Sequence, residues 1–190
     1  MKKILSIILL CSACFVGMRA QHIEYKWHGI YGVVDYAYMT NVNPQSDKTF
    51  LNGFSGICGF QFRKESGIGL GISYVSDPAG AFTQLPIFVE LRSHYLESRL
   101  TPFTAIQAGY TIPSKTSNGG SEAITIQEGG VTFAFIAGGR FAITRTFGVN
   151  LYVGYHLMFM NQVERCHYGQ LAENMPTLFH NVKFGMGFNF

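Results

Sequence analysis

The sequence has few charged residues. Asp, Glu, Lys and Arg make up 13% of the 190 residues, about half of the usual share for a soluble domain. Tryptophan occurs once, whereas aromatic residues as a whole reach 15% and glycine contributes 22 residues. This composition is atypical of a water-soluble globular domain and fits a sheet that faces an apolar medium.

Long apolar runs are absent after residue 20. A membrane-spanning helix needs about 20 consecutive apolar residues. If the remainder of the chain meets lipid, we expect strands to do so, because only helices and closed barrels satisfy every backbone group in hydrocarbon.

The first 20 residues have the pattern of a secretory signal peptide. Lys2 and Lys3 give a basic start, residues 4–16 are mostly apolar, and Ala20 is a small residue at the expected cleavage point. We predict cleavage after Ala20, so that residues 1–20 are the signal peptide and residues 21–190 form one domain. Lipoprotein processing at Cys14 stays open as an alternative.

Removal of this segment leaves no net charge. Without Lys2, Lys3 and Arg19, eleven basic residues balance eleven acidic ones. A neutral chain lacks the basic surface that dominates nucleic-acid affinity, so we expect no nucleic-acid partner.

Alternation of apolar and polar residues recurs in eight segments, which predicts eight half-buried strands. The predicted strands are residues 28–40, 50–62, 67–75, 83–92, 100–111, 129–142, 148–160 and 178–190. Their connections alternate between longer and shorter ones, as in an up-and-down barrel with both ends of the chain on one side. The pattern therefore predicts an all-β, eight-stranded antiparallel up-and-down transmembrane β-barrel.

Charged residues within these strands fall on the side opposite to the apolar residues. They are Asp35, Glu90, Arg92, Arg140 and Lys183. Because a lipid-facing Lys or Arg costs about 2–4 kcal/mol at the bilayer midplane, we expect all five in the barrel interior. We interpret them as a structural charge network that fills the lumen, with a charged pore or ligand site as the alternative.

The final strand carries the most specific pattern. Phe184, Met186, Phe188 and Phe190 alternate with polar or glycine residues, and the chain ends on Phe190. This segment resembles the last strand of small outer-membrane β-barrels of the outer-membrane protein A (transmembrane domain), X or W types. The resemblance implies a multi-pass protein of the Gram-negative outer membrane, in contact with outer-membrane lipid. It also implies that these four residues are an assembly signal read by the barrel-assembly machinery.

Catalytic and metal-binding patterns are weak. Some outer-membrane deacylases use a His with a Ser two residues later, but His156 is followed by Met158 at that spacing. His167 adjoins Cys166 without the paired spacing of a structural zinc site. We predict no catalytic, cofactor or metal residues, and we expect Cys58 and Cys166 to stay unpaired.

Two local features are also expected. Pro86 removes a backbone donor from a strand, which predicts a bulge. Inward-facing glycines in residues 67–71 and at Gly138 are expected to leave room for large side chains such as Phe88 and Tyr152.

The sequence thus favours a non-enzymatic structural or surface-interaction protein. Segments 112–128 and 161–177 are the candidates for contact with a surface partner. A narrow channel for small solutes and a soluble periplasmic ligand-binding barrel are the two alternatives.

Overall fold

A computed structural model describes residues 28–42, 50–63, 66–76, 78, 83–113, 123–166 and 175–190. The predicted signal peptide and Cys14 lie outside the described residues, as does His167. Within the described part of the chain, no helix is long and apolar enough to cross a membrane.

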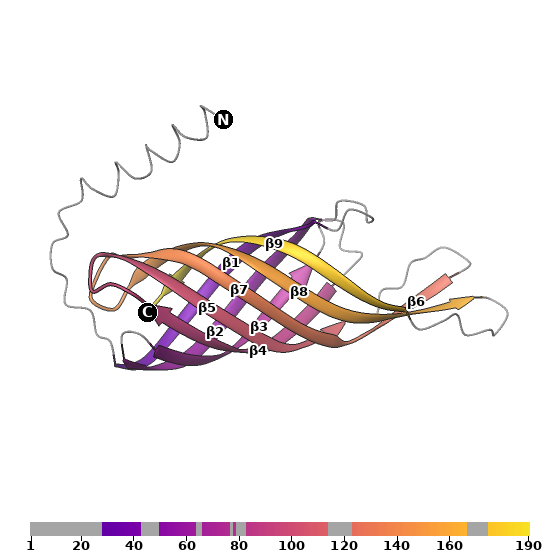
Figure 1. Cartoon of the computed structure of the whole chain (residues 1–190), viewed down its shortest axis with the longest axis horizontal. Helices are drawn as coiled ribbons and strands as arrows, with labels where there is room; N and C mark the ends of the chain where they lie inside the picture. Colours follow the sequence, from indigo (N-terminus) through magenta and orange to yellow (C-terminus); the bar gives the residue numbers. More distant parts are fainter. Residues whose placement is uncertain are drawn as a thin grey trace, which may run out of the picture.

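The described residues form nine strands and no helix. The strands are β1 (Gly29–Asn41), β2 (Phe50–Arg63), β3 (Ser66–Ser76), β4 (Thr83–His94), β5 (Leu100–Pro113), β6 (Ala123–Glu128), β7 (Gly130–Ala142), β8 (Gly148–Cys166) and β9 (Met175–Asn189). Eight of them pair antiparallel in the order β1-β2-β3-β4-β5-β7-β8-β9, and β9 pairs with β1 to close the barrel. Figure 1 shows these strands tilted steeply around one axis.

The closing seam is fully hydrogen-bonded at its end. β1 and β9 pair from Val33↔Asn189 to Asn41↔Asn181. Beyond that register, Gly32 N donates to Phe190 O at 2.7 Å and Phe190 N donates to Gly32 O at 3.0 Å. Closure removes the free sheet edges that would otherwise expose unpaired backbone groups to lipid.

The two faces of the barrel wall differ sharply in chemistry. Large apolar side chains point outward, including Ile30 (82% exposed), Leu70 (67%) and Leu151 (60%). Three small apolar clusters and most buried polar residues lie inside. This arrangement favours a barrel in lipid over a ligand-binding barrel of the soluble type, in which large apolar residues would not cover the outer face.

The eight predicted strands are confirmed, but the structure extends one end of the barrel. β8 continues to Cys166 and β9 begins at Met175, within the segment 161–177 that was expected to connect two strands. β6, which was not predicted, pairs with the end of β8 from Ala123↔Cys166 to Glu128↔Asn161. In Figure 1 these ends lie beyond the other strands, at the barrel end opposite to the C-terminus.

The bulge expected at Pro86 is wrong. Pairing between β3 and β4 is interrupted there, but Ile72↔Ile87 and Val75↔Gln84 lie in the same register, so no residue is inserted. A register shift does occur in the neighbouring pair of strands, β2 and β3, at Gln61 and Arg63. The missing backbone N–H of Pro86 thus interrupts the hydrogen-bond ladder between β3 and β4 but leaves the register of the two strands unchanged.

Candidate functional site in the barrel interior

The centre of the interior is organised around an ion pair. Arg92 Nε donates to Glu90 Oε1 at 2.8 Å, and the two side chains are 5% and 0% exposed. They share β4 two residues apart, which points both to the same face of the strand. Gln107 on β5, directly opposite Glu90 in the register, donates through Nε2 to Glu90 Oε2 at 2.7 Å. Both carboxylate oxygens therefore accept a hydrogen bond, as a buried charge requires.

Aromatic rings flank two of the interior cations. The Arg92 guanidinium lies 4.9 Å from the centre of the Phe103 ring, and Lys183 Nζ lies 5.4 Å from the centre of the Tyr152 ring. Cation–π contacts of this length are attractive and gain strength away from water. They stabilise cations on the inner wall without adding further charge.

Glycines make room for the large interior rings, as the sequence predicted. A β-carbon built on Gly71 would overlap the Phe88 ring, and one on Gly138 would lie 2.6 Å from Tyr152 Cβ. Gly185, opposite Tyr152 in the β8–β9 register, would also overlap the Tyr152 ring if it carried a side chain. In the interior, each of these large side chains therefore lies against a glycine, which has no side chain.

All five predicted lumen charges lie inside the barrel. Asp35 is 4% exposed and Arg140 is 1% exposed, and the other three are between 0 and 5%. The structure brings Glu90 and Arg92 into direct contact, whereas Asp35 lies over Gly187 of β9. Their role as a structural network remains a prediction.

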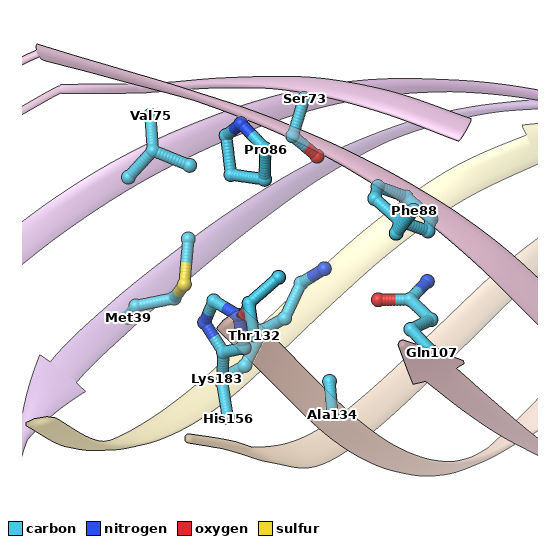
Figure 2. Close-up of a pocket in the computed structure, with 10 residues that line it drawn as sticks. All are labelled: Met39, Ser73, Val75, Pro86, Phe88, Gln107, Thr132, Ala134, His156 and Lys183. Carbon is cyan, nitrogen blue, oxygen red and sulfur yellow. Dashed lines mark hydrogen bonds between the residues drawn. The ribbon is translucent and has the colours of Figure 1, made fainter. Parts of the chain in front are cut away.

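A small cavity lies between the Glu90–Arg92 pair and the end of the barrel that carries β6. Its volume is about 20 Å³, measured as the space open to the centre of a water molecule. Figure 2 shows its lining, whose polar groups come from Ser73, Gln107, Thr132, His156 and Lys183. About 10–15 Å³ by this measure holds one water molecule, so the cavity has room for a ligand of that size.

His156 has a hydroxyl partner that the sequence did not reveal. Thr132 Oγ1 lies 2.5 Å from His156 Nε2, and both side chains are buried. The partner sits on β7, so inspection of residues close to His156 in sequence could not find it. His156 and Thr132 face the interior cavity and not the apolar outer wall, so this pair does not meet lipid.

The four residues of the predicted assembly signal lie on the outer face of the barrel, as does Cys58. Phe184, Met186, Phe188 and Phe190 are all exposed on the outer face, between 45 and 59%. Their role as an assembly signal is not tested by this placement. Cys58 is a free, exposed thiol, and no cluster of three metal-binding side chains occurs among the described residues.

Comparisons with known proteins identify the fold. No protein-family model and no curated protein matches the sequence. Neisserial surface protein A has a TM-score of 0.62 at 14% identity, covering 84% of this chain and 95% of that chain. OprG from Pseudomonas aeruginosa has a TM-score of 0.59 at 12% identity, covering 88% of this chain and 99% of that chain.

The chain has the fold of the small outer-membrane β-barrels. Ail, the attachment invasion locus protein of Yersinia pestis, is a further example, with a TM-score of 0.50 at 13% identity over 87% of this chain and 100% of that chain. The resemblance that the final strand suggested is confirmed at the level of the fold. At these identities the likeness to small outer-membrane barrels shows architecture and leaves activity open.

Proposed function

We propose that the protein is an integral, multi-pass protein of the Gram-negative outer membrane, with a non-enzymatic structural or surface-interaction role. The observation that supports this most is the sorting of residues across the barrel wall. Leu70 is 67% exposed on the outside, whereas Glu90 on the inside is 0% exposed. In water this arrangement would expose a continuous apolar surface, while in a bilayer it places hydrocarbon against lipid.

The topology supports an orientation. The turns at residues 95–99 and 143–147 lie at the same end of the barrel as Phe190, and β6 with the ends of β8 and β9 lies at the other. In outer-membrane barrels the short turns are periplasmic and the longer connections are external. We therefore assign segments 112–128 and 161–177 to the cell surface, where they would contact a surface partner.

Maturation follows from the same proposal. Residues 1–20 would direct export and be removed, leaving residues 21–190 as the barrel domain. The exposed Phe184, Met186, Phe188 and Phe190 would then be read by the barrel-assembly machinery while the β1–β9 seam closes.

A heat-modifiability gel on detergent-extracted outer membranes tests the proposal. A closed barrel resists unfolding in cold detergent, so we expect the unboiled sample to migrate differently from the boiled one. Recovery of the protein in the soluble periplasmic fraction, with identical migration before and after boiling, would reject it.

A narrow channel is the second candidate, favoured by the charged interior. The cavity near Lys183 measures about 20 Å³, and another of about 40 Å³ lies near Arg145 at the barrel end that holds Phe190. Neither is large enough by itself for a solute to pass through. We expect no steady conductance in planar bilayers. A conductance that changes on Glu90→Gln or Arg140→Gln substitution would favour the channel over a filled barrel.

A further inference from the structure

Gly32 and Phe190 form the last pair of the β1–β9 seam among the described residues. The backbone N–H of each residue donates to the carbonyl oxygen of the other, at 2.7 and 3.0 Å. The last pair of a strand ladder has a neighbouring pair on one side only, so it opens more readily than the pairs behind it. Side-chain contacts across the seam therefore matter more for this pair than for the others.

The Phe190 side chain crosses the seam and covers Gly32. A β-carbon built on Gly32 would lie 2.5 Å from Phe190 Cε2 and 2.7 Å from Phe190 Cζ. Gly32 shares the outer face of β1 with Ile30 and Tyr36, which are 82% and 51% exposed, so the contact lies on the outside of the barrel. An aromatic ring that covers a glycine of the neighbouring strand stabilises the pairing of the two strands.

The glycine at this position has a packing reason that another outer-face glycine lacks. Glycine weakens the interior of a strand, because it loses more conformational freedom and offers no side chain to pack. Gly56 of β2 also lies on the outer face, but a β-carbon built there meets nothing within 4 Å. The cover provided by Phe190 is thus specific to Gly32.

Phe188 has a different partner. Its ring stacks on Phe147, which precedes β8, with ring centres 5.7 Å apart and an angle of 13° between the planes. The last two aromatic residues of the chain therefore contact opposite neighbours of β9, Phe188 on the side of β8 and Phe190 on the side of β1. Only the second of these contacts joins the two strands that close the barrel.

We propose that Phe190 and Gly32 form a latch, in which the ring seated on Gly32 holds the end of the seam closed in the finished barrel. This role is additional to the assembly signal proposed for Phe190, because it acts after closure and needs no assembly machinery. It depends on the closed seam alone and not on the cellular role proposed above.

Hydrogen exchange at the seam, measured by NMR on the folded barrel in detergent micelles, tests the latch. Phe190→Ala removes the ring and creates no overlap. We expect the Gly32 amide to exchange about two- to fivefold faster in this variant, the range for one cross-strand contact. On the wild type, contacts between the ring protons of Phe190 and the α-protons of Gly32 should appear in NOE spectra.

Gly32→Val tests the seat while leaving the proposed assembly signal intact. The added side chain would displace the ring, so the Phe190 amide should exchange faster by a similar factor. Without a latch the expected sign is the opposite, because valine favours strands more than glycine does. Gly56→Val is the matched control and should leave exchange at Phe190 unchanged.

The double variant Gly32→Val/Phe190→Ala separates the latch from effects on the β1 backbone. With no ring to displace, the valine should not accelerate exchange at residue 190 relative to Phe190→Ala alone. Equal acceleration by Gly32→Val in both backgrounds would overturn the proposal. Unchanged exchange of the Gly32 amide in Phe190→Ala would overturn it whether or not Gly32→Val folds, and absence of the ring contacts in the wild type would do so without any variant.

Discussion

The Glu90–Arg92 pair offers a quantitative test of the interior. Replacing Arg92 with Met keeps much of the side-chain volume but leaves the Glu90 carboxylate with Gln107 as its hydrogen-bond donor. Removing one partner of a buried ion pair typically costs about 3–5 kcal/mol. We therefore expect the unfolding equilibrium constant to rise by roughly two to three and a half powers of ten.

A double-mutant cycle separates the pair from the loss of packing. Arg92→Met and Glu90→Gln each leave one buried group short of its partner, whereas the double variant removes both charges together. Because the side chains are 5% and 0% exposed, we expect a coupling energy of about 1–3 kcal/mol. The double variant should then be more stable than the sum of the two single effects allows.

The assay is urea unfolding of the barrel in lipid vesicles, followed by circular dichroism and cold gel migration. Arg145→Gln, on the exposed turn between β7 and β8, is the control for loss of an arginine and should change the unfolding free energy by less than about 0.5 kcal/mol. The coupling should also persist in high salt, since buried pairs are poorly screened. A coupling energy near zero, or one abolished by salt, would refute the assignment of a buried pair.

Three further predictions concern the wall of the barrel. Gly185→Val should destabilise the protein by about 1–3 kcal/mol in the same urea assay, because its side chain would overlap the Tyr152 ring. Leu70→Arg, on the outer face in the middle of β3, should cost about 2–4 kcal/mol in vesicles, and a neutral effect would place that face away from lipid. A water-soluble maleimide added to intact cells should label Cys166 and spare Cys58, whereas the opposite pattern would contradict the proposed orientation.

The barrel was predictable from sequence because its wall separates two media. Each strand alternates between lipid and lumen, so an outward Leu70 and an inward Ser73 report the face without knowledge of the neighbouring strands. One buried polar face and one lipid face also fix the register, since a slip by one residue would exchange them. This is why the inward location of Asp35 and Lys183 could be inferred from parity alone.

Contacts within the interior were not predictable in the same way. Whether Glu90 meets Gln107, or His156 meets Thr132, depends on how neighbouring strands are staggered. Stagger is a property of the closed sheet and is not encoded in the period of any single strand. β6 was missed for a related reason: its six residues are stabilised as a strand by pairing with the end of β8, and a pattern that short is ambiguous by itself.

Closure also explains why the interior residues act in pairs. The number and stagger of the strands fix the barrel radius, so the space inside cannot adjust to each side chain separately. The Tyr152 ring occupies the space left by Gly185, and the Phe88 ring occupies the space left by Gly71. An open pore would require the removal of several such rings at once. Each removal would leave a void in the interior, because the barrel radius is fixed and the wall cannot contract around it. The charges gathered between these rings are therefore held in fixed positions, which gives the cavity beside Lys183 a defined size.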